Sequence, residues 1–169
     1  ARLKIGENIV IFGAGGVGLN IIQGAKLAGA NQIIAVDQWE NRLELAKKFG
    51  ATSTINIKSI DDLETSVLFE MAGFPIDIVA DNTGIPSLIN KAYNLISKDG
   101  RVILVGVPKK GDHTTIYTLP MHFGKRLIGS EGGATDPERD IPKYINLIKN
   151  GKLEYRDLVS SVHKINDIN

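Results

Sequence analysis

Short apolar runs alternate with stretches of helical periodicity along almost the whole chain, and this alternation limits the fold more than any other feature. The apolar runs predict strands at residues 8–12, 33–36, 54–57, 76–80, 101–105 and 126–130. Helices are predicted between them at residues 17–28, 39–49, 60–71 and 86–95, and a last helix around residues 141–148. The run at 101–105 is apolar from its second residue on, which is typical of a strand inside a parallel sheet that is covered on both faces. The sequence therefore predicts an α/β fold with a doubly wound six-stranded parallel sheet, and right-handed crossovers favour the strand order 3-2-1-4-5-6.

Length and composition exclude several classes of protein. The chain has 169 residues, which fits a single domain over residues 1–169 with a full hydrophobic core. The formal net charge is +1, so neither nucleic acid nor an anionic membrane is expected as a partner. No apolar run reaches the ~18 residues of a membrane span and no signal peptide is visible, so a cytoplasmic location is expected. Because cysteine is absent, disulfides, thiolate metal sites and cysteine nucleophiles are excluded within these residues.

A glycine-rich turn follows the first predicted strand. Gly13, Gly15 and Gly18 match the pattern G-x-G-x-x-G and open the first helix. Gly13 is expected to turn the chain tightly, Gly15 to let a diphosphate approach the backbone, and Gly18 to let the helix pack on the strand. A P-loop would need Lys after its last glycine, whereas Leu19 follows Gly18, so ATP hydrolysis is not expected. This context predicts a Rossmann fold that binds the diphosphate of a dinucleotide at a helix N-terminus.

An acidic residue ends the second predicted strand. Asp37 stands 19 residues after Gly18, the place from which a carboxylate binds the hydroxyl groups of the adenosine ribose. A 2′-phosphate would meet this negative charge, so NAD is favoured over NADP, although Arg42 in the next helix could soften the preference. Asp37 could equally serve as the N-cap of the helix at 39–49, and the two roles can coexist.

Several further segments resemble the cofactor-binding domain of the medium-chain, zinc-type alcohol dehydrogenases and their polyol and threonine relatives. These segments are NRLELAKKFGAT (residues 41–52), DNTG (81–84), VGVP (105–108) and IGSEGG (128–133), and with the glycine loop they span nearly the whole chain. The resemblance implies that Gly16 and Val17 line the diphosphate, that Arg42 reaches the adenosine ribose, and that Asn82 and Thr83 flank the cofactor. It places the nicotinamide end near Val105, Gly106, Val107, Ser130 and Glu131, although Glu131 departs from the apolar residues often found there.

The resemblance also implies an activity for a longer parent protein. In this family an amino-terminal GroES-like catalytic domain carries the zinc ligands, and hydride passes between an alcohol or polyol and NAD. That catalytic domain is absent from this chain, so the fragment alone is expected to be inactive, with zinc in the parent only. His113, His122 and His163 are scattered, so no metal site and no catalytic residue is expected here. A Tyr-x-x-x-Lys pair is also missing, which excludes a short-chain dehydrogenase.

Four packing expectations follow from the pattern. Val17, Ile21, Ala25 and Ala28 are expected to form the buried stripe of the first helix. Residues 126–130 are expected as a core strand, and Ile165 with Ile168 begins another helical period. Residues 115–118, around Ile116, are expected as an exposed edge strand that pairs two copies, since the resemblance implies a dimer. Alternatively, this strand is tucked under its own loop.

Two other functions stay open at this point. An NAD-sensing regulatory module without catalysis would share the glycine loop and the acid after the second strand, but not the VGVP and IGSEGG segments in their places. A methyltransferase could use Asp37 on the ribose of S-adenosylmethionine. Its sheet would end in an antiparallel hairpin, which residues 125–151 do not suggest.

Overall fold

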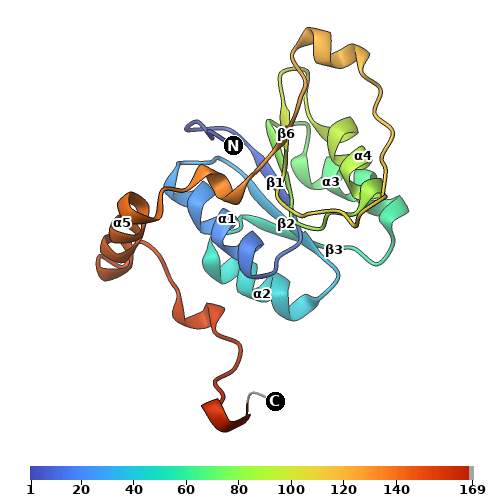
Figure 1. Cartoon of the computed structure of the whole chain (residues 1–169). Coiled ribbons are helices and arrows are strands. Elements are labelled where there is room, and N and C mark those ends of the chain that lie inside the picture. The colour runs from blue at the N-terminus through green and yellow to red at the C-terminus, as the bar shows by residue number, and fades with distance from the viewer. Residues whose placement is uncertain (168–169) are drawn as a thin grey trace. The chain divides into compact units, whose positions relative to one another are not determined.

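The computed structural model describes residues 1–167, which divide into a compact unit at residues 1–133 and a second unit from residue 134 onward. The first unit contains a six-stranded sheet in which every pairing is parallel, in the order β3-β2-β1-β4-β5-β6 (Figure 1). The strands are β1 (Ile9–Phe12), β2 (Ile33–Asp37), β3 (Ser53–Asn56), β4 (Ile78–Asp81), β5 (Arg101–Leu104) and β6 (Arg126–Gly129). The predicted fold class and strand order are confirmed.

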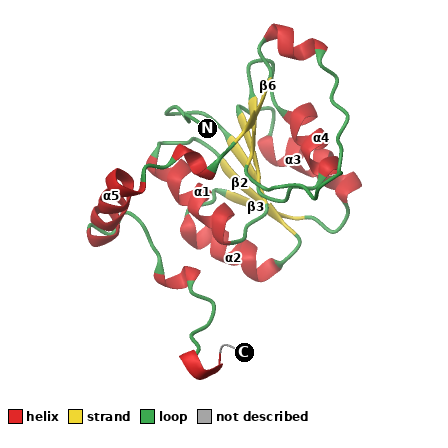
Figure 2. Ribbon diagram, in the orientation of Figure 1, coloured by secondary structure: helices red, strands yellow, loops and turns green. Residues whose placement is uncertain are grey.

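Helices cover both faces of this sheet. Helices α1 (Gly16–Leu27) and α2 (Glu40–Phe49) pack on one face, and α3 (Leu63–Met71) and α4 (Pro86–Leu95) pack on the other (Figure 2). Strands β1, β2 and β4 are buried along their whole length because they lie between the two helical layers. Successive side chains of these strands therefore pack against the helices on opposite faces of the sheet. The core under α3 and α4 includes Phe12, Val36, Val79 and Tyr93.

The register of the sheet brings three chain segments to one edge. Phe12 pairs with Val36 of β2 and with Asp81 of β4, so all three strands end at the same level. The residues that follow them therefore meet at the carboxyl edge of the sheet. The chain runs outward from β1 to β2 and β3 and then crosses back to β4 on the other side of β1. This reversal opens the crevice in which doubly wound folds bind ligands.

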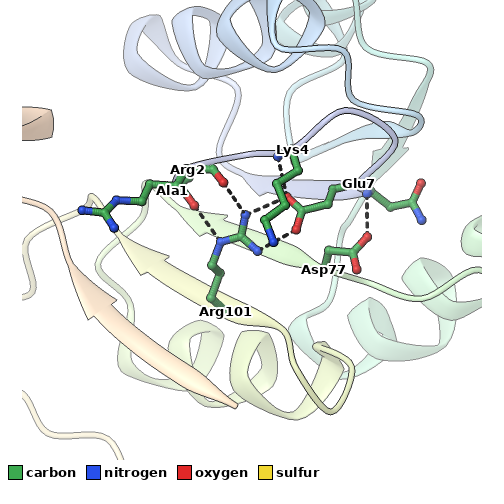
Figure 3. Close-up of polar contacts among 7 residues, drawn as sticks. Ala1, Arg2, Lys4, Glu7, Asp77 and Arg101 are labelled. Atoms are coloured by element: carbon green, nitrogen blue, oxygen red, sulfur yellow. Dashed lines mark hydrogen bonds and ion pairs between the residues drawn. The ribbon is translucent and has the colours of Figure 1, made fainter. Parts of the chain in front are cut away.

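The opposite, amino edge of the sheet holds a buried ion pair. Arg101 begins β5 and is only 5% exposed, and its guanidinium donates to both oxygens of the Glu7 carboxylate at 3.0 and 2.7 Å (Figure 3). Its remaining hydrogen bonds go to the carbonyl groups of Ala1, at 2.6 Å, and Arg2, at 3.1 Å. The hydrogen bond from Arg101 is the largest cause that lowers the pKa of Glu7. One arginine thus fastens the first residues of the chain to the amino end of the sheet.

Three packing expectations are wrong in whole or in part. In α1 Ala25 is buried as expected, but Leu19 and Ile22 are the large buried side chains, and Val17 is exposed. Residues 115–118 form no strand, because this segment runs past α4 and is held there by hydrogen bonds from Asn90 to the Thr115 carbonyl and from Thr114 to the Pro86 carbonyl. Strand β6 pairs with β5 alone among the described strands, so its residues are largely exposed at the sheet edge rather than in the core.

The second unit contains the last predicted helix. Helix α5 (Pro137–Lys149) contains the predicted residues 141–148, begins with Pro at its first position and ends just before Asn150 and Gly151. Short 3-10 turns follow at Arg156–Leu158 and Ile165–Asp167, and Ile168 lies outside the described residues. Among residues 1–167, no helix has the length and apolar character needed to span a membrane.

Candidate functional site

The glycine loop leaves the end of β1 and turns sharply into α1. Gly13 has a φ of +89°, a left-handed value that confirms the expected tight turn, and its N–H donates to the Val36 carbonyl at 2.8 Å. The amide of Asn82, after β4, donates to the carbonyl groups of Phe12 and Gly13 at 3.2 and 3.3 Å. Both neighbouring strands therefore hold the start of this loop in place.

Gly18 fits where no other residue would. A Cβ atom at this position would lie 2.0 Å from the Gly13 carbonyl oxygen. The absence of a side chain lets the first turn of α1 sit directly on the end of β1, which agrees with the packing role expected from the sequence. This contact also sets the rotation of α1, so that Leu19, Ile22 and Ala25 face the sheet.

The N-terminus of α1 is open on the side away from the sheet. Gly15 is the N-cap residue and makes no side-chain capping bond, and a Cβ atom on Gly15 or Gly16 would meet no protein atom within 4 Å. The first N–H groups of any helix lack partners inside the helix, and the helix dipole adds about half a positive charge there. The bare backbone of the loop therefore forms a cradle suited to an anion, without any basic side chain.

A cavity of about 440 Å³ lies over this cradle. Nine of the predicted site residues line it: Gly13, Gly15, Gly16, Val17, Gly18, Asp37, Arg42, Asn82 and Thr83. Sequence reasoning missed the rest of the lining, which consists of Phe12, Val36, Gln38, Ile57, Lys58, Ile60, Leu63, Ile85 and Leu88. Gln38, Ile57 and Lys58 directly follow β2 or β3, so the ends of these two strands were the signal that could have found those three residues.

Asp37 sits at one side of the cavity with its carboxylate almost fully buried. One oxygen accepts the N–H of Ala14 at 2.8 Å and the other accepts the N–H of Trp39 at 3.0 Å. Arg42, whose side chain is half exposed, lies 3.6 Å from the first oxygen. Helix α2 begins at Glu40 with Trp39 as its N-cap residue, so Asp37 stabilises the turn before the helix and is not itself the N-cap.

The turn after β4 forms the other side of the cavity. Asp81 is fully buried and accepts hydrogen bonds from the N–H groups of Thr83 and Gly84 and from the Thr83 hydroxyl. These bonds fix the turn so that the side-chain amide of Asn82 donates to the Phe12 and Gly13 carbonyl groups. The side-chain oxygen of Asn82 is buried without a hydrogen-bond partner among the described residues. A buried acceptor without a partner costs free energy, so a ligand that donates to Asn82 would satisfy it.

The residues expected at the nicotinamide end do not line this cavity. The N–H groups of Val105 and Gly106 both donate to the Asp81 carbonyl, and Gly106 packs against the backbone of residues 82–84 so closely that a Cβ would lie 2.4 Å from the Gly84 nitrogen. Val107 is 89% exposed, and Glu131 is also exposed. The Ser130 N–H donates to the Leu104 carbonyl and so extends the pairing of β6 with β5 by one residue. All five residues follow β5 or β6 at the same edge of the sheet, but outside the cavity.

Neither histidines nor carboxylates form a metal cluster in this structure. Within residues 1–167, no three side chains of His, Asp or Glu come together in a way that could hold a metal ion. His113 lies in a shallow polar depression beside α4, away from the glycine loop.

Comparison with known proteins finds dehydrogenases both by sequence and by structure. Residues 16–150 match the family described as zinc-binding dehydrogenase. Alcohol dehydrogenase 1 of Trifolium repens is 35% identical over 172 aligned residues, a match that covers all of this chain and 45% of that protein. Benzyl alcohol dehydrogenase from Acinetobacter calcoaceticus superposes with a TM-score of 0.82 at 32% identity, covering 89% of this chain and 41% of the other. For 2R,3R-butanediol dehydrogenase from Bacillus subtilis the TM-score is 0.77 at 26% identity, covering 94% and 43%.

The chain thus spans less than half the length of each of these relatives. The matched range contains Gly16, Val17 and Gly18 of the glycine loop, the acid at the end of β2 and the segments after β4 and β5 that were expected to carry the resemblance. It also contains every strand from β2 to β6. The chain belongs to the zinc-binding dehydrogenase family.

Proposed function

We propose that this chain is the NAD-binding domain of an oxidoreductase that transfers a hydride between NAD and an alcohol or polyol. The observation that carries the proposal is the open backbone cradle at the N-terminus of α1 beside the buried carboxylate of Asp37, both in one cavity of about 440 Å³. A volume of this size lies in the ordinary range for small-molecule sites. The cradle, the carboxylate and the cavity volume together support the binding of the adenosine diphosphate part of a dinucleotide.

Each part of the coenzyme has a proposed place. Gly13, Gly15, Gly16, Val17 and Gly18 would hold the diphosphate through backbone N–H groups. Asp37 and Arg42 would bind the adenosine ribose, and the apolar side chains of Ile57 and Ile60 would cover the adenine. Asn82 and Thr83 would flank the coenzyme on the other side, with the Asn82 side-chain oxygen as a free acceptor.

The nicotinamide end is proposed to lie beyond the cavity, along the ends of β5 and β6. Val105, Gly106, Val107, Ser130 and Glu131 would hold it there, chiefly through backbone groups. When bound, the nicotinamide supplies the hydride donor or acceptor, and this domain contributes its position. The zinc ion and the groups that bind the alcohol would come from the rest of a longer parent protein.

NAD is proposed as the preferred coenzyme because a 2′-phosphate would approach the buried carboxylate of Asp37. Two cations, Arg42 and Lys58, line the same cavity and would offset part of that repulsion. The preference is therefore expected to be moderate rather than absolute. A cytoplasmic location and a homo-oligomer remain predictions for the parent protein.

Calorimetric titration tests the proposal. NAD, NADP and S-adenosylmethionine are titrated into the wild-type chain at one salt concentration, because the phosphate contacts are screened by salt. NAD is expected to bind most tightly, NADP more weakly, and the methyl donor not at all. Equal affinity for NAD and NADP would refute the discriminating role of Asp37, and tight binding of the methyl donor alone would favour a methyltransferase.

A regulatory module that senses NAD without catalysis would give the same titration. The family match is what favours the dehydrogenase, because it extends over residues 16–150 and includes the segments after β4 and β5. The two functions differ in the parent protein, where only the dehydrogenase would reduce NAD with an alcohol. Activity with benzyl alcohol and butanediol is the first assay to make on that protein.

A further inference from the structure

The carboxylate of Asp37 is already engaged before any ribose reaches it. Its side chain is 4% exposed, and its two oxygens accept backbone N–H groups from two different segments, Ala14 in the glycine loop and Trp39 in the turn that starts α2. A carboxylate has about four acceptor sites, so two remain for other donors. The residue expected to bind ribose is thus also a bridge between two backbone segments.

The bond to Ala14 has a particular place in the loop. Ala14 lies between Gly13 and Gly15 and is fully buried. Gly13 donates to the Val36 carbonyl, and Ala14 donates to the Asp37 carboxylate, so two successive N–H groups of the loop are held by two successive residues of β2. A buried backbone N–H without an acceptor is costly. The path of the loop just before the cradle therefore depends on the Asp37 side chain.

The acceptor itself is fixed. Asp37 is the last residue of β2, where it pairs with Asn56 of β3, and its own carbonyl accepts the N–H of Ile57 at 3.0 Å. Arg42 approaches the same carboxylate oxygen at 3.6 Å, from the exposed side. A carboxylate suits this place because both of its oxygens are acceptors, whereas an asparagine would direct its NH₂ group at one of the two backbone N–H groups.

We infer that Asp37 is a positioning residue that holds the glycine loop in its anion-binding conformation, independently of its contact with ribose. The inference rests on the proposed function in taking the cradle as a diphosphate site. Its consequence is that coenzyme preference and loop geometry are coupled through one side chain. Replacing Asp37 to admit NADP would loosen the loop and weaken the binding of every ligand with a diphosphate.

The first test needs no ligand. Hydrogen exchange of the Ala14 amide is followed by NMR in the wild-type chain and in Asp37→Ala, relative to core amides such as Val10 and Ile34. Exchange at Ala14 is expected to accelerate roughly ten- to hundredfold, the range that a hydrogen bond to a charged group supports. Arg42→Met is the matched control, because it removes the ion pair but neither backbone bond, and it is expected to leave Ala14 unchanged.

The second test uses a nucleotide that has no ribose hydroxyl groups. For 2′,3′-dideoxyadenosine diphosphate, a carboxylate that only recognises ribose has nothing to bind, and its removal would strengthen binding by removing a negative charge. If Asp37 positions the loop, Asp37→Ala is expected to weaken this ligand about tenfold, as the diphosphate contacts lose their geometry. Unchanged or tighter binding of the dideoxy nucleotide, with unchanged exchange at Ala14, would overturn the inference.

Two further outcomes keep the tests decisive. If Asp37→Ala does not fold, Asp37→Asn takes its place: at least one of the Ala14 and Trp39 amides is expected to lose protection, and full protection of both would overturn the inference. If the wild-type chain binds no nucleotide at all, the proposed function fails. The exchange rates then still decide whether Asp37 holds the loop.

Discussion

Replacing Gly18 by alanine tests both the packing of the loop and its proposed function. The added Cβ would lie 2.0 Å from the Gly13 carbonyl oxygen and 3.0 Å from the Gly13 carbonyl carbon, which are backbone atoms at the end of a buried strand. The oxygen would have to retreat by more than 1 Å to reach ordinary contact, and Asn82 holds it through a hydrogen bond. Overpacking of this kind costs about 1–3 kcal/mol, and α1 is expected to move off β1.

Two other glycines of the same segment provide matched controls. At Gly15 an added Cβ meets no protein atom within 4 Å and φ is −74°, so Gly15→Ala is expected to change the free energy of unfolding by less than about 1 kcal/mol. Its methyl group would nevertheless project from the cradle and weaken NAD at least about tenfold. Gly24 lies on the exposed side of α1 with open space around it, so Gly24→Ala is expected to stabilise the chain by about 0.5–1 kcal/mol and to leave NAD binding unchanged.

Urea unfolding followed by far-UV circular dichroism, with calorimetric titration of NAD, separates these outcomes. Gly18→Ala should lose both stability and affinity, Gly15→Ala affinity alone, and Gly24→Ala neither. A Gly18→Ala protein with the wild-type urea midpoint would refute the steric argument. A Gly15→Ala protein that binds NAD as the wild type does would show that the diphosphate does not lie on the cradle.

Three other predictions concern charges. Arg101→Met is expected to lower the free energy of unfolding by about 2–4 kcal/mol at pH 7, because it leaves two carbonyl groups without their donor and Glu7 with only the Lys4 N–H. Since Arg101 lowers the pKa of Glu7, the stabilisation is fully present above about pH 4.5 and is lost as the pH falls through the lowered pKa, so urea midpoints of wild type and variant should converge in acid. Lys58→Glu should weaken NADP about fivefold more than NAD in the same titration, because it adds a second carboxylate to the cavity that Asp37 lines. Lys125→Met should cost about 1 kcal/mol in urea, since the ammonium group donates to two carbonyl groups at the end of α4.

The sheet could be predicted from the sequence because its signals are local and agree with one another. Each strand is a short apolar run between turn residues, and once six strands alternate with helices, the handedness of the crossovers leaves few possible orders. The same topology brings Gly13, Asp37 and Asn82 to one edge, since each follows a strand that pairs with β1 or is β1 itself. That is why nine of the proposed site residues share one cavity.

Long-range packing could not be predicted in the same way. Apolar spacing favours Val17 as a buried residue of α1, but the contact between Gly18 and Gly13 rotates the helix so that Leu19 and Ile22 face the sheet. The β-branched run around Ile116 has the composition of a strand, yet side-chain bonds to α4 hold its neighbours in an irregular path. Lys58 lines the cavity because β3 ends beside β2. The predicted strand order places these two strand ends side by side, but it does not give the direction of the side chain that follows β3.

Two acidic residues near the cavity, Asp37 in its lining and Asp81 buried behind Thr83, bind backbone N–H groups. Asp37 holds the loop after β1 and the turn after β2, and Asp81 holds the turn after β4, so a carboxylate stands on each side of β1. Their negative charges are thereby compensated by backbone dipoles next to a site proposed for an anion. The cradle keeps its own N–H groups at the start of α1 available for the ligand, and it needs no lysine or arginine to attract the diphosphate. Rigid turns held in this way reduce the ordering that binding would otherwise require, which is the condition under which a bare backbone can bind a dinucleotide tightly.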